Sequence, residues 1–190
     1  MSEAVVRRWL KVADATAMTT RETLQRALSY GRTVRDLTRS EIVAFQSPAS
    51  QESLEDGLAV LSRETNMILN PNKHFMQIAA GEDILSARGN VCVLVTEAGR
   101  GGSLAEVITR RRLPGHPVSA TWMGTLWELD LDTGDPYALA LEMALGRERK
   151  KGLLANPHVH TVCVLGGTPT AAQTANALRR AEHEETDVLV

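Results

Sequence analysis

Two segments of the sequence share one pattern, and that pattern most constrains the fold that the chain can adopt. Each contains a short β-branched apolar run, a glycine-rich turn, a hydroxyl residue and then a helical pattern. The first runs from Asn90 to Arg112 and the second from Thr161 to Arg180. A strand that leads through a tight turn into a helix is typical of α/β sheets. The sequence therefore predicts two strand-to-helix units in the C-terminal part of the chain.

The N-terminal part is expected to be helical. Ala4–Ala13 carries apolar residues at roughly helical spacing, and Thr19–Glu22 and Thr38–Glu41 each match the capping box that opens a helix. Pro48 is suited to the first turn of a further helix, because its φ is already helical. The apolar stripe of that helix is formed by Leu54, Leu58 and Leu61. Residues 1–66 are thus predicted to be a helical N-terminal segment.

The turn signal Asn70–Asn72 separates this segment from residues 67–190, the predicted α/β domain. Val118–Leu131 alternates with bulky apolar residues on both sides, which predicts a strand covered on both faces. Strands and helical patterns then alternate to the end of the chain. We expect an α/β fold with a mixed, mostly parallel sheet of about four to five strands, flanked by helices.

Composition is that of an ordinary globular protein, with 43% hydrophobic and 23% charged residues. The net charge of −2 gives no overall attraction to nucleic acid. No apolar run approaches the ~20 residues that span a bilayer, and the N-terminus lacks the features of a secretory signal. We expect a bacterial-type cytoplasmic protein without a membrane partner, and the net charge disfavours a nucleic-acid partner without excluding local basic clusters.

The two glycine-rich turns are the candidate ligand-binding loops. Glycine lets a backbone approach an anion, and the following helix N-terminus offers N–H groups to it. The candidate residues are Gly99, Arg100, Gly101, Gly102 and Ser103 in the first turn, and Gly166, Gly167, Thr168 and Thr170 in the second. The first turn does not match a Walker A or dinucleotide fingerprint, and both turns are also explained as helix caps. If both turns lie at one edge of the sheet, they face a shared crevice.

Candidates for acid–base chemistry are Glu97, His74 and His116, because imidazole titrates near neutrality and Glu97 precedes the first loop. His158 and His160 lie two residues apart, so they project from the same side of a strand and are candidate metal ligands. The sequence identifies no cofactor. The two cysteines are in apolar strands, where we expect free, buried thiols.

These features favour a non-catalytic regulatory or assembly subunit. It would bind a phosphorylated metabolite or nucleotide at the two loops and contact a protein partner through residues 1–65. One alternative is an enzyme acting on a phosphorylated small molecule. Another is a DNA-binding regulator with an α/β sensor part, because Thr20–Leu37 has a faint helix-turn-helix pattern and several arginines. A homo-oligomer is expected, with Trp9 as an interface anchor.

Overall fold

Strands and helices alternate along almost the whole chain. The structure, a computed structural model, describes residues 1–28, 30–66, 68–97, 102–110, 118–146, 153–183 and 188–189. In chain order the elements are β1 (Ser2–Leu10), α1 (Ala15–Glu22), a π-helical turn (Thr23–Ala27), β2 (Val34–Ser47), α2 (Gln51–Glu64), β3 (His74–Ala79), β4 (Val91–Glu97), α3 (Gly102–Arg110), β5 (Ala120–Leu131), α4 (Pro136–Leu145), β6 (His160–Gly166), α5 (Ala171–His183) and β7 (Val188–Leu189).

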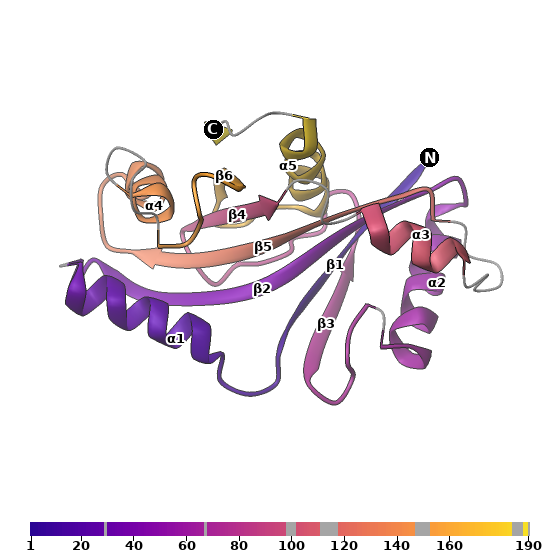
Figure 1. The fold of residues 1–190 in the computed structure, drawn as a ribbon, viewed down its shortest axis with the longest axis horizontal. Coiled ribbons are helices and arrows are strands. Elements are labelled where there is room, and N and C mark those ends of the chain that lie inside the picture. Colours follow the sequence, from indigo (N-terminus) through magenta and orange to yellow (C-terminus); the bar gives the residue numbers. More distant parts are fainter. Residues whose placement is uncertain are drawn as a thin grey trace.

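The strands form one sheet in the order β3-β1-β2-β5-β4-β6-β7. Every pairing from β3 to β6 is antiparallel, and the two-residue β7 alone adds in parallel, to β6. The long strands β2 and β5 cross the centre of the molecule (Figure 1). The expectation of a mostly parallel sheet of four to five strands is therefore wrong.

Strand direction differs from the expectation because the helices do not return the chain along the preceding strand. At 1.5 Å per residue, the nine residues of α3 span roughly 14 Å, whereas the seven residues of β4 span roughly 23 Å. α3 instead packs against β5. β5 consequently starts where β4 ends and runs in the opposite direction.

The expected helical N-terminal segment is also wrong, because it contains two long strands. Residues 2–10 form β1, and the capping box at Thr38–Glu41 lies inside β2. Ala4, Val5 and Val6 are all buried, since β1 lies between two strands and is covered on both faces. A short apolar run of this kind does not distinguish a buried strand from a buried helix.

Helices cover both faces of the sheet. Along β2, Val43 and Phe45 face a cluster with α2 and α3, whereas Ile42 and Ala44 face a cluster with α5. Along β4, Val93 joins the cluster that contains α4 and α1, on the same side as α2 and α3. One face therefore carries α1 to α4, and the other carries α5.

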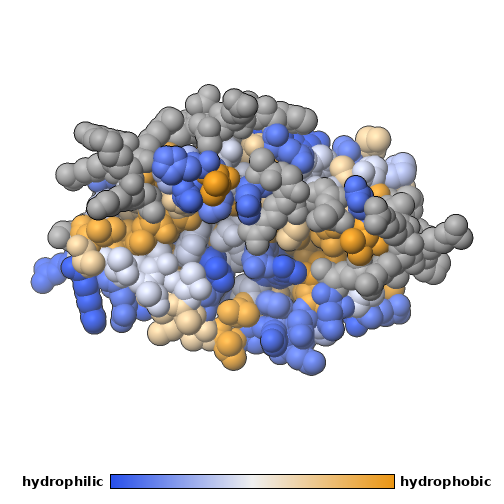
Figure 2. Space-filling model, viewed as in Figure 1, coloured by the Kyte–Doolittle hydropathy of each residue, from blue (hydrophilic) through white to orange (hydrophobic). Residues whose placement is uncertain are grey.

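The hydrophobic residues visible in Figure 2 form separate patches between hydrophilic ones. Among the residues that the structure describes, no helix combines the length and the apolar character needed to cross a membrane.

The order of elements repeats once along the chain. β1-α1-β2-α2-β3 is followed by β4-α3-β5-α4-β6. In the sheet, the three strands of the first half have the order β3-β1-β2, and their counterparts follow in the reverse order, β5-β4-β6. β2 and β5 begin at Val34 and Ala120, 86 residues apart. Ser40 pairs with Leu126, which is also 86 residues away. A residue that pairs with its own counterpart marks a pseudo-twofold axis, so the fold consists of two similar halves.

The last strand of each half begins with the same turn, Asn-Pro-x-x-His. In the first half, His74 Nδ1 accepts a hydrogen bond from Asn70 N at 3.2 Å, and Asn70 Oδ1 accepts one from Asn72 N at 3.0 Å. In the second half, His160 Nδ1 accepts from Asn156 N at 2.9 Å, and Asn156 Oδ1 accepts from His158 N at 3.1 Å. The repeat is thus local as well as topological.

The two turns should respond alike to mutation. Asn70→Ala and Asn156→Ala each remove one side-chain hydrogen bond, so each should lower the free energy of unfolding by about 1 kcal/mol in urea titrations. Asn72→Ala is the control, because its side chain makes no recorded bond among the described residues. Costs that differ strongly between the two turns would contradict their equivalence.

Candidate functional site

A cavity lies where β1 separates from β2. β1 pairs with β2 only as far as Glu41, whereas β2 continues along β5 to Val34. In the other half, β4 pairs with β5 as far as Gly124, the counterpart of Thr38. β1 thus leaves β2 three residues earlier, while its other edge stays paired with β3 to Leu10. The separation leaves a cavity of about 240 Å³ beside Thr38.

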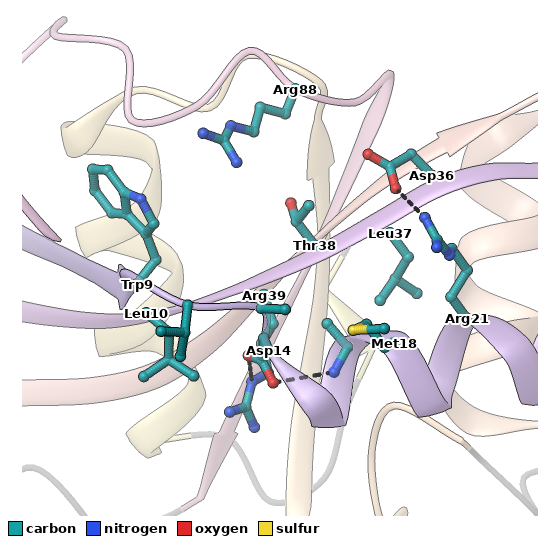
Figure 3. A pocket seen from close by; sticks show the side chains of 13 residues that line it. Trp9, Leu10, Asp14, Met18, Arg21, Asp36, Leu37, Thr38, Arg39 and Arg88 are labelled. Carbon is teal, nitrogen blue, oxygen red and sulfur yellow. Dashed lines mark hydrogen bonds and ion pairs between the residues drawn. The ribbon is translucent and has the colours of Figure 1, made fainter. Parts of the chain in front are cut away.

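We call this cavity the Trp9–Arg88 pocket. Its walls come from the end of β1, the turn into α1, the first half of β2 and the loop before β4 (Figure 3). The lining residues are Trp9, Leu10, Val12, Ala13, Asp14, Ala17, Met18, Arg21, Asp36, Leu37, Thr38, Arg39 and Arg88. Three arginines and two aspartates give the lining a net charge of +1.

Asp14 connects the floor of the pocket to α1. One carboxylate oxygen caps the helix, accepting hydrogen bonds from Thr16 N at 2.9 Å and Ala17 N at 3.2 Å. The other accepts a bond from Arg39 Nε at 3.0 Å. A single side chain therefore fixes both the start of α1 and the guanidinium of Arg39.

The cationic groups of the pocket differ in their pairing. Arg21 Nη1 lies 2.9 Å from Asp36 Oδ1, and both side chains are substantially exposed. The Arg88 side chain is also exposed, and its guanidinium has no recorded hydrogen bond or ion pair among the described residues. Figure 3 shows Arg88 extending toward the side of the pocket formed by Trp9. Arg88 is thus the cation best placed to bind a ligand anion.

Trp9 supplies a flat apolar wall. The Arg7 guanidinium lies 4.9 Å from its ring centroid, and the Phe75 ring lies 5.9 Å away at an interplanar angle of 38°. These contacts hold the ring at the end of β1 while it still lines the cavity.

A buried ion pair lies behind this wall. Arg7 Nη2 donates to Glu128 Oε2 at 2.6 Å, and Thr38 Oγ1 donates to the same oxygen at 3.0 Å. Arg7 also donates to Ser40 Oγ and to the carbonyl of Leu85. Glu128 Oε1 is buried without a hydrogen-bond partner in the structure. The network connects the two halves of the fold directly beneath the pocket.

The cysteines are free and buried, as predicted from their apolar strands. Burial, with the nearby Glu128 charge adding to it, raises the pKa of the Cys92 thiol to about 12, and burial also raises the pKa of Cys163. Both thiols therefore stay protonated at neutral pH, which makes them poor nucleophiles.

A smaller cavity of about 50 Å³ adjoins the pocket and shares Trp9 and Asp14 with it. His74, one of the predicted acid–base residues, lines this cavity together with Glu41. The structure thus places one predicted site residue beside the pocket.

The strands that precede the two predicted ligand loops end at opposite ends of the sheet. β4 and β6 are neighbours, but Val91 pairs with Gly166 and Glu97 pairs with His160. The carboxyl end of each strand therefore meets the amino end of the other, so the two strands do not lead to one edge of the sheet, the condition set for a shared crevice. Gly99, Arg100 and Gly101 lie outside the described residues, while Gly102 and Ser103 open α3.

The second loop is occupied by contacts within the chain. Thr170 and Gln173 form a reciprocal capping box, and Ala171 N and Ala172 N donate to the carbonyls of Asp83 and Gly81. With the bond from Thr174 N to Thr170 O, the first four N–H groups of α5 all have acceptors. Ligand binding by Gly166, Gly167, Thr168 and Thr170 stays a prediction.

The remaining candidates are dispersed. Glu97 faces His160 across the β4–β6 ladder, His158 is exposed in the preceding turn, and His116 lies outside the described residues. Among the described residues, no three histidine, cysteine or acidic side chains group as metal ligands would.

The lining of the Trp9–Arg88 pocket was missed in the sequence, because its residues come from separate segments without a fixed spacing. Only Asp14 gives a local signal, as an N-cap residue directly before a helix.

Comparison with known proteins finds no protein family that matches the chain and no curated protein similar to it.

Substitution of Asp14 should separate its two roles. Asp14→Asn keeps a side-chain cap but loses the charge paired with Arg39, so it should cost less than about 1 kcal/mol of unfolding free energy. Asp14→Ala loses both and should cost about 1–2 kcal/mol in chemical denaturation. Equal costs for the two variants would show that the cap contributes nothing.

Gly167 is required by close backbone packing. A Cβ at this position would lie 2.4 Å from the carbonyl oxygen of Gly89, so Gly167→Ala should cost about 1–3 kcal/mol of unfolding free energy. Gly134→Ala is the matched control, because nothing lies within 4 Å of the position that a Cβ would take there. Thermal denaturation that leaves Gly167→Ala as stable as Gly134→Ala would contradict this packing.

Proposed function

We propose that the protein is a binding protein for a small phosphorylated molecule with a planar ring, the chemical class to which nucleotides belong. The ligand occupies the Trp9–Arg88 pocket. The observation that carries this proposal is the Arg88 guanidinium, which is exposed, without a recorded partner among the described residues, and opposite an indole wall.

Each part of such a ligand has a matching group in the pocket. Arg88 binds the phosphate through charge-assisted hydrogen bonds, and the planar guanidinium suits two phosphate oxygens at once. The indole of Trp9 stacks on the ring of the ligand. Arg21 and Arg39 add positive potential, although each is also paired with an aspartate.

We also propose a regulatory role in the cytoplasm for this binding. The pocket includes the N-cap of α1, and the Arg7–Glu128 pair behind it joins the two halves of the fold. A ligand that contacts this region acts on elements from both halves. This connection supports a role in transmitting ligand binding to a partner.

An enzyme acting on a phosphorylated small molecule is the second candidate. His74 favours it, because this imidazole lines the cavity that adjoins the pocket. Its Nδ1 accepts a bond from Asn70 N, which leaves Nε2 to carry the proton of the neutral ring. Phosphorus NMR of the ligand after incubation and removal of the protein separates the candidates, because only an enzyme leaves the resonances of a new phosphorus compound in solution.

Tryptophan fluorescence should detect the ligand. Adenosine monophosphate is the first probe, with adenosine and inorganic phosphate as its two parts, and it should quench fluorescence at lower concentration than either part. Arg88→Ala should weaken its binding about 10- to 100-fold, since a hydrogen bond to a charged group is lost.

Arg63→Ala is the control, because Arg63 is exposed on α2 and outside the pocket. Trp9→Leu should reduce the affinity for adenosine monophosphate more than the affinity for phosphate. The proposal fails if no member of a panel of nucleoside monophosphates binds the wild-type protein or the Arg63→Ala control at millimolar concentration. It also fails if Arg88→Ala binds adenosine monophosphate as tightly as the control.

A further inference from the structure

β3 is an edge strand whose second edge is open. One edge pairs with β1 over six residues, and no strand among the described residues pairs with the other. Lys11 N donates to Lys73 O at 2.9 Å, so the carbonyl group of Lys73 points toward β1. Because main-chain groups alternate along a strand, those of Phe75, Gln77 and Ala79 also point toward β1. The N–H and C=O groups of Met76 and Ile78 therefore point outward.

The edge lacks the devices by which proteins protect such strands. β3 has the sequence His-Phe-Met-Gln-Ile-Ala, with no lysine, acidic residue or proline. Its pairing with β1 contains no bulge. Phe75 is 50% exposed, and only Ala79 in this strand is fully buried. A regular, uncharged and partly apolar edge is a template for a further strand.

The other half of the fold shows what this edge accepts. β6 is the counterpart of β3, and there β7 adds along the outer edge. Thr161 to Val164 of β6 are buried, in contrast to the corresponding part of β3. The same position in the two halves thus carries an added strand in one and none in the other.

We propose that β3 pairs antiparallel with β3 of a second copy, so that the protein forms a twofold dimer with one continuous sheet. Self-pairing across a twofold axis uses the same surface on both copies, and two adjacent strands related in this way run antiparallel. Met76 and Ile78 then exchange main-chain hydrogen bonds with their counterparts. This proposal is independent of the ligand.

Charges at the two ends of the strand are complementary in this arrangement. Lys73 precedes β3 and Glu82 follows it, both are exposed, and neither has a recorded ion-pair partner among the described residues. Antiparallel pairing centred near Gln77 places Lys73 of one copy beside the end that carries Glu82 of the other. The contact occurs twice in the dimer, once on each side of the axis.

The test is sedimentation equilibrium of the full chain with a charge exchange. The wild-type protein should be a dimer at micromolar concentration. Lys73→Glu and Glu82→Lys should each raise the dissociation constant about tenfold or more, because each brings like charges together twice. The double variant should restore the wild-type value. Glu22→Lys is the control. It makes the same change of charge as Glu82→Lys at an exposed position on α1, and it should leave the dissociation constant unchanged.

Amide hydrogen exchange provides a second readout. Met76 and Ile78 amides should exchange slowly in the dimer and rapidly in the dissociated single variants. The proposal is overturned if the wild-type protein stays monomeric at concentrations up to about 100 μM. It is equally overturned if the single reversals leave the dimer intact, or if the double variant fails to restore it.

Discussion

The antiparallel pairing of β2 with β5 is the constraint on which the rest of the structure depends. It joins the two halves at the pseudo-twofold axis, where Ser40 pairs with Leu126. Once these strands pair, the order of all the others follows from the same unit used twice. The buried Arg7–Glu128 pair connects the halves a second time, on the α5 face. Removal of one partner of such a pair leaves a buried charge, which typically costs about 3–5 kcal/mol.

The pocket arises because the two halves are not identical. β4 remains paired with β5 to Gly124, whereas β1 turns away after Arg8 and exposes the corresponding stretch of β2. Its walls therefore combine an aromatic side chain from β1, a helix cap and arginines from three segments. The open edge of β3 has the same origin, since β7 covers only its counterpart in the second half. Both proposed functions of the molecule follow from differences between similar halves.

Local patterns in the sequence predicted most of the individual elements in the second half. The strands at Val91, Ala120 and His160 are confirmed, because apolar runs and alternation are local signals. Strand direction was not predictable in this way, since it depends on where α3 packs. The similarity of the segments around Cys92 and Cys163 was real, but those strands are antiparallel neighbours. The repeat that organises the fold instead relates Asn70 to Asn156. Their turns share only the asparagine, proline and histidine of the Asn-Pro-x-x-His motif.

We propose that the antiparallel sheet places the ligand site in the Trp9–Arg88 pocket and not at the glycine-rich turns. The most direct test is a two-dimensional NMR titration of labelled protein with adenosine monophosphate. We expect the largest shifts at the amides of Leu10, Asp14, Thr38 and Arg88 and at the Trp9 indole. Shifts that concentrate instead at Gly166, Gly167 and Thr170, with the pocket unchanged, would contradict it.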